Sequence, residues 1–277
     1  LLWRYLGWEE YMPTWGHLPL ILKPDGNGKL SKRDGDRLGF PVFAMDWTDP
    51  KTNETTKGFK ELGFMPEAFI NLLAMLGWSS GEEREIFSKE ELIALFNMEH
   101  VHKGGAKFDF EKAKWFNHEW IKHSEVDSLF ENVKRILEQN GVDIKSNDYL
   151  KQVIALVKDR CILLNDFSVQ ASYFFVSPEE IDTTSIQEKW DANKEAFFNR
   201  METVFKDMTP WDMPTIESSF KQVATEQQCK VGELQGIFRI MLVGGKFGPG
   251  VFQIAEMIGK EEVLLRMHKC MQLLTKL

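Results

Sequence analysis

The stretch Gly28-Lys29-Leu30-Ser31-Lys32-Arg33-Asp34-Gly35-Asp36 combines positive charge with backbone freedom in a way that core packing does not require. It holds two lysines and an arginine within five positions, and a serine stands between the lysines. Glycine at either side permits backbone angles that other residues avoid, and the ammonium groups of Lys29 and Lys32 can meet on one polyanion. The composition predicts a mobile loop that faces phosphate groups. A solvated basic turn is the alternative interpretation.

The residues before this loop favour the first interpretation. Leu6-Gly7-Trp8 is followed by Pro13 and by Trp15-Gly16-His17-Leu18-Pro19-Leu20-Ile21-Leu22. Together with Lys29-Leu30-Ser31-Lys32-Arg33, this run resembles the second ATP-binding signature of glutamyl-tRNA synthetases, which are class I aminoacyl-tRNA ligases. The resemblance implies a parent enzyme that attaches glutamate to glutamate-specific tRNA in two steps that consume ATP.

The resemblance also assigns roles to the loop. It implies that Lys29, Ser31, Lys32 and Arg33 bind ATP, which carries Mg²⁺. Lys29 and Lys32 are the expected catalytic residues, because they would stabilise the phosphates as pyrophosphate leaves, and Lys32 is the more direct contact. Two departures concern this region: Asp34-Gly35 stands where the family usually has His-Gly, and the connection over residues 40–60 is longer.

The chain begins at Leu1 without an initiator methionine or a targeting segment, so we expect the C-terminal portion of such a synthetase. No His-x-Gly-His first signature occurs between residues 1 and 277. We therefore expect this chain alone to bind tRNA without activating glutamate.

The composition is that of a soluble globular protein. Hydrophobic residues make up 43% and charged residues 27% of the chain, and no apolar run approaches the ~20 residues of a membrane span. The separated Cys161, Cys229 and Cys270 predict neither disulfides nor a zinc site, which indicates a reducing, cytoplasmic compartment. We also expect a monomer with no membrane contact. The net charge of −8 argues against indiscriminate nucleic-acid binding, although basic residues gathered on one face would permit selective binding.

Helical patterns dominate after residue 60. Pro66 suits the first position of a helix, and Ser88-Lys89-Glu90-Glu91 is a capping-box pattern. Further helix starts are predicted at Ser177-Pro178-Glu179-Glu180 and at Thr215. Short strands are predicted over residues 18–22 and 42–47.

The predicted fold class is mainly α. With the resemblance, we expect a small α/β stem-contact region at the N-terminal end, followed by an all-helical anticodon-binding domain of two helical bundles. The expected domains are residues 1–40, the end of the catalytic region with the signature loop; 41–123, the stem-contact domain; and 124–277, the anticodon-binding domain, with a softer boundary near 182–190.

Four basic residues are candidates for RNA contact. Lys103 and Lys107 flank Gly104-Gly105, where ammonium and backbone donors can reach a phosphate oxygen. Arg160 and Arg239 lie beside apolar helical stripes in runs that resemble the anticodon-binding part of the family. The alternative interpretation is that each arginine is structural and pairs with acidic helices.

Other functions receive less support from the sequence. Gly244 to Gly250 is rich in glycine, but it lacks the Gly-Lys-Ser/Thr ending of a nucleotide-binding loop, which favours an inter-helix turn. His100, His102, His118 and His123 lack the spacing of a metal site, so no metal is expected. An all-helical, non-catalytic protein-interaction scaffold with an acidic surface is the alternative function.

Overall fold

Local signals begin the helices that the sequence predicts most clearly. The computed structural model describes residues 1–31, 34–187 and 189–274. Pro66 is the first residue of α4 (Pro66–Met75), where its missing N–H leaves no bond unmade. Ser88 and Glu91 form the reciprocal capping box of α5 (Lys89–Leu95). Both predicted helix starts are confirmed.

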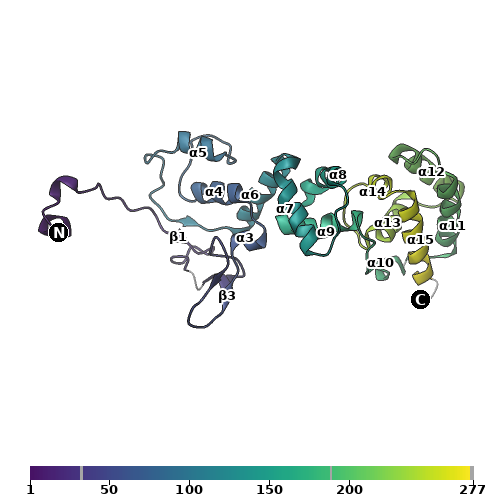
Figure 1. Cartoon of the computed structure of the whole chain (residues 1–277), viewed down its shortest axis with the longest axis horizontal. Coiled ribbons are helices and arrows are strands. Elements are labelled where there is room, and N and C mark those ends of the chain that lie inside the picture. Colours follow the sequence, from purple (N-terminus) through teal and green to yellow (C-terminus); the bar gives the residue numbers. More distant parts are fainter. Residues whose placement is uncertain (32–33, 188, 275–277) are drawn as a thin grey trace. The chain divides into compact units, whose positions relative to one another are not determined.

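The chain divides into two compact units, Leu1–Trp120 and Ile121–Leu277. The first unit holds two small sheets and short helices (Figure 1). Its other elements are α1 (Leu2–Tyr5), η1 (Glu9–Tyr11), β1 (Ile21–Leu22), α2 (Asp34–Leu38), β2 (Trp47–Thr48), β3 (Thr55–Thr56), α3 (Phe59–Leu62), β4 (Ala106–Lys107) and most of α6 (Phe110–His123).

The strands of the first unit are shorter than the sequence predicts. In residues 18–22 only Ile21 and Leu22 form a strand, because β4 pairs in parallel with these two residues. In residues 42–47 only Trp47 belongs to a strand, which pairs antiparallel with β3. A strand needs a hydrogen-bonded neighbour along its length, and the described residues provide one only over these short segments.

Aromatic side chains fill the interior of the first unit. The buried ring of Phe59 lies 4.7 to 6.4 Å, centroid to centroid, from the rings of Phe64, Phe69, Phe108 and Phe110. Such ring pairs contribute about 0.5–1.5 kcal/mol each beyond their buried area. This cluster joins α3, α4 and the segment that follows β4 into one core.

The second unit is all-helical. Its first group of elements comprises α7 (Val126–Gln139), α8 (Asn147–Val157), η2 (Lys158–Arg160), η3 (Leu164–Asp166), α9 (Phe167–Gln170), η4 (Ser172–Phe174) and α10 (Thr184–Gln187). The second group comprises α11 (Ala192–Asp207), α12 (Met213–Glu226), α13 (Val231–Val243), α14 (Val251–Ile258) and α15 (Lys260–Leu274). The predicted fold class, mainly α with an all-helical C-terminal part, is confirmed.

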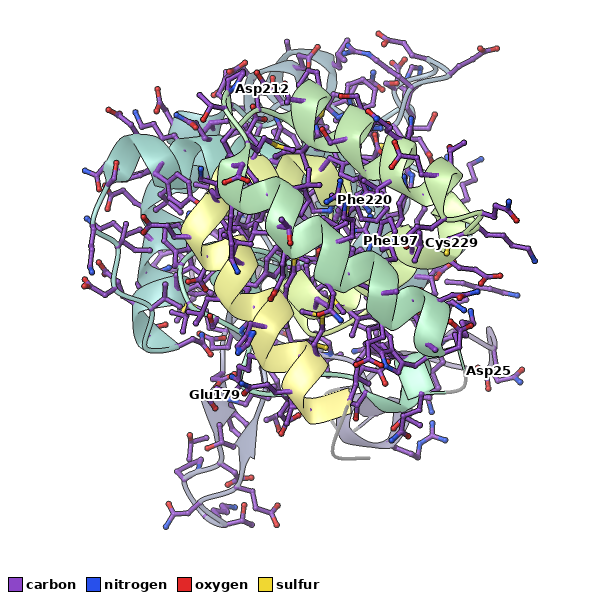
Figure 2. All side chains as sticks on the ribbon, turned by 90° about the vertical axis from the view of Figure 1, so that its right-hand side faces the viewer. Asp25, Glu179, Phe197, Asp212, Phe220 and Cys229 are labelled. Carbon is purple, nitrogen blue, oxygen red and sulfur yellow. The ribbon has the colours of Figure 1, made fainter. Side chains whose placement is uncertain are left out.

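Phenylalanine rings fill the interior of α11 to α15. Phe197 on α11 and Phe220 on α12 are fully buried, and their ring centroids lie 4.9 Å apart in an edge-to-face arrangement. Figure 2 labels both residues among the side chains of these helices. Phe238 on α13 extends the cluster, because its ring lies 5.4 Å from that of Phe220.

Two predicted helix starts in the second unit are wrong. Residues 177–180 are not helical; the hydroxyl of Ser177 donates to the carboxylate of Glu262 on α15 and caps no helix of its own. The helix α12 begins at Met213, two residues before Thr215, and Asp212 is its N-cap, which accepts a hydrogen bond from the Thr215 N–H at 2.9 Å. In the first case a tertiary contact binds the candidate cap, and in the second a nearby aspartate caps the helix in place of the threonine.

Candidate functional site

The signature loop is part of a hairpin that begins in β1. Leu22 and Lys29 pair as an antiparallel bridge. The Lys23 N–H donates to the Gly28 carbonyl at 3.1 Å, and the Leu30 N–H donates to the Ile21 carbonyl at 2.8 Å. The turn at Gly26 and Gly28 has positive φ angles of 78° and 88°, which glycine adopts without strain.

The carboxylate of Asp34, the first residue of α2, bonds Ser31. One oxygen of Asp34, Oδ2, accepts from the Ser31 N–H at 2.9 Å and from the Ser31 hydroxyl at 2.6 Å. The other oxygen, Oδ1, meets Lys23 Nζ at 3.2 Å and Arg37 Nη2 at 3.1 Å. The carboxylate is almost wholly shielded from solvent and is fully hydrogen-bonded.

The hydrogen bond from the Ser31 hydroxyl, with that from the Ser31 N–H, holds the pKa of the Asp34 carboxyl well below its usual range. Asp34 is therefore charged in the folded protein at neutral pH. The sequence analysis did not predict that Asp34 would bond Ser31. The two residues nevertheless have the S-x-x-D spacing that resembles a capping box, the pattern that identified the helix start at Ser88. Lys23 was also missed, because the residue that it contacts lies on a different element.

The structure describes only some of the residues that are predicted to bind ATP. Lys29 is exposed and makes no ion pair with any described residue. Lys32 and Arg33 lie outside the described residues. Ser31 is present in the loop, but its hydroxyl proton is directed to Asp34, so only the oxygen lone pairs remain for a further partner.

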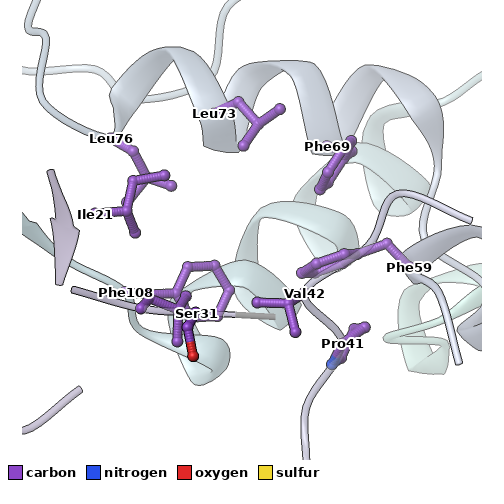
Figure 3. A pocket seen from close by; sticks show the side chains of 10 residues that line it. Ile21, Ser31, Pro41, Val42, Phe59, Phe69, Leu73, Leu76 and Phe108 are labelled. Atoms are coloured by element: carbon purple, nitrogen blue, oxygen red, sulfur yellow. The ribbon is translucent and has the colours of Figure 1, made fainter. Parts of the chain in front are cut away.

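An apolar cavity of about 210 Å³ lies beneath the hairpin. Figure 3 shows Ile21 and Phe108 on one side of it and Leu73 and Phe69 of α4 on another. Leu30, the apolar residue of the signature, also lines the cavity. Leu30 therefore anchors the hairpin to the core, while Lys29 beside it remains in solvent.

Lys103 and Lys107 are both exposed, and neither makes an ion pair among the described residues. Lys103 lies in the loop before Gly105, whose backbone approaches so closely that an added Cβ would lie 2.9 Å from the Leu20 carbonyl oxygen. Lys107 belongs to β4 and pairs with Leu22. The two lysines therefore stand on the segment that lies next to the signature hairpin.

The two candidate arginines differ in their surroundings. Arg239 on α13 is half-buried, and its Nη1 group is shared among the carbonyl oxygens of Phe247, Gly248 and Pro249. Burial lowers the pKa of the Arg239 guanidinium. Arg160 at the end of η2 is exposed, without a hydrogen bond or ion pair to another described residue. Arg239 thus holds the glycine-rich turn, and Arg160 is free to contact a partner.

The described residues show neither a metal-binding cluster nor a membrane-spanning helix. Residues 1–31, 34–187 and 189–274 contain no group of three or more His, Cys, Asp and Glu side chains arranged to hold a metal ion. None of the helices in this part of the chain combines the length and the apolar character that a membrane crossing needs.

Comparisons with known proteins cover the chain from end to end. The family described as "Anticodon binding domain" matches residues 118–271. The family described as "tRNA synthetases class I (E and Q), catalytic domain" matches residues 1–115. Both matches agree with the resemblance seen in the signature hairpin.

Two similar proteins of known name are both glutamate–tRNA ligases. The chain is 42% identical over 277 residues to the glutamate–tRNA ligase of Phocaeicola vulgatus, covering 99% of this chain and 54% of the relative. It is 44% identical over 270 residues to that of Flavobacterium psychrophilum, covering 97% of this chain and 52% of the relative. The chain thus spans about half the length of the relatives it matches.

Solved structures give the same result. A glutamate tRNA ligase of Elizabethkingia meningosepticum, crystallised with its amino acid, matches with a TM-score of 0.90 and 37% identity over 99% of this chain and 54% of its own. The glutamate–tRNA synthetase of Elizabethkingia anophelis matches with a TM-score of 0.83 and 38% identity over 98% of this chain and 53% of its own. The chain belongs to the glutamate–tRNA ligase family of class I tRNA synthetases.

Proposed function

We propose that this chain is the tRNA-binding, C-terminal part of a cytoplasmic, monomeric ligase that attaches glutamate to glutamate-specific tRNA. In the first step the carboxylate of glutamate attacks the α-phosphorus of ATP, so that a mixed anhydride forms and pyrophosphate leaves. In the second step the anhydride transfers glutamate to a hydroxyl at the tRNA 3′ end and AMP leaves. The relatives and both family matches support this proposal.

The signature hairpin supplies positive charge to the first step. Lys29 projects from a hairpin that Leu30 anchors and that the Ser31–Asp34 pair fixes at its far end. Its ammonium group is unpaired among the described residues and exposed, so it can meet the negative charge that develops on the leaving pyrophosphate. Lys32 and Arg33 are proposed to act with it on the nucleotide, which carries Mg²⁺. The exposed, unpaired Lys29 beside a fixed Ser31 is the observation that carries this proposal.

The proposed domain roles follow the chain. Residues 1–40 complete the catalytic region, residues 41–123 contact a stem of the tRNA, and residues 124–277 bind the anticodon, with a boundary near 182–190 inside the last domain. Lys103 and Arg160 are proposed tRNA contacts, because each is an exposed cation that forms no ion pair within the described ranges. Arg239 is proposed to shape the turn that faces the anticodon.

Binding of tRNA to residues 1–277 across a salt series tests the proposal. We expect preferential binding to glutamate-specific tRNA, and an affinity that falls linearly with salt on a double logarithmic plot, because each neutralised phosphate releases a counterion. Arg160→Ala should weaken binding, whereas Arg135→Ala should leave it unchanged, since Arg135 is an exposed arginine of α7 whose side chain bonds only Asn132 among the described residues. Absence of binding even at low salt would instead support the helical scaffold.

A second measurement concerns catalysis. The sequence between residues 1 and 277 contains no His-x-Gly-His signature, and we propose that this chain alone does not activate glutamate. ATP–pyrophosphate exchange should therefore be at background with residues 1–277 and measurable with the complete ligase. Exchange by residues 1–277 alone would contradict this part of the proposal.

A further inference from the structure

Three neighbouring strand segments place Lys29, Leu22 and Lys107 in one row. Leu22 of β1 pairs with Lys107 of β4 in parallel register on one side. On the other side Leu22 pairs with Lys29 as an antiparallel bridge. Residues directly opposite each other on adjacent strands project from the same face of a sheet. Lys29 and Lys107 therefore project from the same face, with Leu22 between them.

The neighbouring residues on each strand show from which face of the sheet the two lysines project. Ile21, Leu30 and Phe108 are the next residues along the three segments, and all three line the apolar cavity beneath the hairpin. Figure 3 labels Ile21 and Phe108 there. Successive side chains of a strand point to opposite faces. The face that carries Lys29 and Lys107 is therefore the face turned away from the cavity, and both lysines are exposed there.

The side chain of Lys107 is directed toward the hairpin that carries Lys29. A Cβ atom added to Gly26 would lie 2.6 Å from Cε and 3.1 Å from Nζ of Lys107. Gly26 belongs to the turn between Leu22 and Lys29 and has a φ of 78°. The absence of a side chain at Gly26 thus lets the stem of Lys107 lie across the turn, with its ammonium group over the hairpin.

The separation of the two lysines suits one polyphosphate. Neighbouring strands lie about 4.8 Å apart, so two strand spacings separate the Cα atoms of Lys29 and Lys107 by roughly 10 Å. Each ammonium stands on a flexible four-carbon stem. Neither forms an ion pair in the part of the chain that the structure describes, and Asp25, the carboxylate of the same turn, accepts the N–H of Asn27.

We propose that Lys107 is a second phosphate-contacting residue of the signature hairpin, acting with Lys29 on the polyphosphate of the nucleotide. Sequence reasoning placed Lys107 among the RNA contacts, because it follows Lys103 in a glycine-containing loop. The pairing of Lys107 with Leu22 and the closeness of its side chain to Gly26 favour a role together with the hairpin. This inference rests on the proposed role of the hairpin in binding ATP.

The test uses ATP–pyrophosphate exchange by the complete ligase at saturating tRNA and glutamate, with ATP varied. Lys107→Met keeps an aliphatic stem over Gly26 and removes the charge, and Lys107→Arg restores the charge. Lys89→Met is the matched control, since Lys89 is an exposed lysine of the same unit with no ion pair among the described residues. The dissociation constant for tRNA is measured for every variant.

We expect Lys107→Met to raise the KM for ATP about tenfold, the size of one charge-assisted contact, and to leave the tRNA dissociation constant unchanged. Lys107→Arg should recover most of the affinity, and Lys89→Met should behave as wild type. In the double variant with Lys29→Ala, the combined loss should be smaller than the product of the single losses, because both side chains contact one group.

Two results would overturn the inference. Wild-type exchange with Lys107→Met while Lys29→Ala is impaired would show that Lys107 takes no part in nucleotide binding. Weakened tRNA binding with unchanged exchange would return Lys107 to the RNA contacts. If Lys29→Ala also left exchange unchanged, the proposed ATP-binding role of the hairpin would fail, which is a separate outcome from failure at Lys107 alone.

Discussion

Ser31 donates both its backbone N–H and its hydroxyl to the same carboxylate oxygen of Asp34, at 2.9 Å and 2.6 Å. The second oxygen of Asp34 meets Lys23 from the end of β1 and Arg37 from α2. One carboxylate thereby connects the start of the hairpin to the helix that follows it. These contacts give Asp34 a structural role at the end of the hairpin.

The Ser31–Asp34 pair should loosen as the pH falls. Hydrogen bonds from Ser31 hold the pKa of Asp34 below its usual range in the folded protein. The charged Asp34 carboxylate therefore stabilises the folded protein fully above roughly pH 4, the ordinary pKa of an aspartate. This stabilisation is lost as the pH falls through the lowered pKa of Asp34 in the folded state. Hydrogen exchange of the Ser31 amide, followed by NMR, should show protection at pH 6 that falls only well below pH 4.

Asp34→Asn should abolish this pH dependence and leave the Ser31 amide less protected at pH 6, because an amide accepts hydrogen bonds more weakly than a carboxylate. Asp25→Asn is the control, since Asp25 lies in the exposed turn and its carboxylate bonds only the N–H of Asn27 in the part of the chain that the structure describes. A Ser31 amide that stays equally protected in Asp34→Asn would show that the backbone alone fixes this turn.

Removal of Arg239 should destabilise the second unit. Arg239→Ala deprives the carbonyls of Phe247, Gly248 and Pro249 of their shared donor. Hydrogen bonds to charged groups contribute about 1.5–3 kcal/mol, so we expect a loss of about 2 kcal/mol in urea unfolding. Arg160→Ala should change the free energy of unfolding by less than about 0.5 kcal/mol, as for other surface substitutions.

The two arginine variants should also differ in how they affect tRNA binding. Arg160→Ala should weaken binding without a change in stability, whereas any loss in Arg239→Ala should accompany altered mobility of the turn at residues 244–250. Equal stability of Arg239→Ala and wild type would refute the structural role of Arg239.

Tyr149 should stabilise the second unit through its hydroxyl. Its oxygen lies 3.1 Å from the carbonyls of both Phe174 and Met257, so one hydroxyl connects α8 with η4 and α14. Burial raises the pKa of Tyr149 to about 12, which keeps the proton on the hydroxyl at neutral pH. Tyr149→Phe should lower the free energy of unfolding by about 1–2 kcal/mol, measured by urea denaturation, because part-buried carbonyls lose their donor.

Tyr173→Phe is the matched control for Tyr149→Phe. The Tyr173 hydroxyl is buried and has no hydrogen-bond partner among the described residues, and burial raises its pKa. Its removal should leave stability unchanged or slightly higher, because a buried unpaired hydroxyl carries a desolvation cost. If Tyr173→Phe lowered the free energy of unfolding as much as Tyr149→Phe, the hydrogen bonds of Tyr149 would not explain its effect on stability.

The three cysteines should differ in reactivity. Cys161 and Cys270 are buried, and burial raises the pKa of both thiols, that of Cys270 to about 12. Cys229 lies after α12 and is only half-buried. Since the thiolate is the reactive form, Cys229 should react first with a disulfide reagent at pH 8, and Cys161 and Cys270 only on unfolding. Mass spectrometry of labelled peptides would decide this, and early labelling of Cys161 would contradict it.

The sequence by itself determined the features that depend on residues close along the chain. The hairpin signature, the Ser88 capping box and the helix start at Pro66 each involve neighbours within a few positions. Their energies come from local hydrogen bonds and backbone preferences. The helical stripes were readable for the same reason, because residues three and four apart share one face of a helix. The family resemblance then placed these elements in a known order.

Only the tertiary structure decided which distant groups meet. Strand pairing placed Lys107 beside the hairpin of Lys29, and no local pattern encodes the register between β1 and β4. Arg239 and Ser177 each had several possible partners, and packing selected the carbonyls of a turn for one and Glu262 for the other. A polar side chain bonds whichever complementary group the fold brings within about 3 Å, so its role follows from the folded chain and not from its neighbours in sequence.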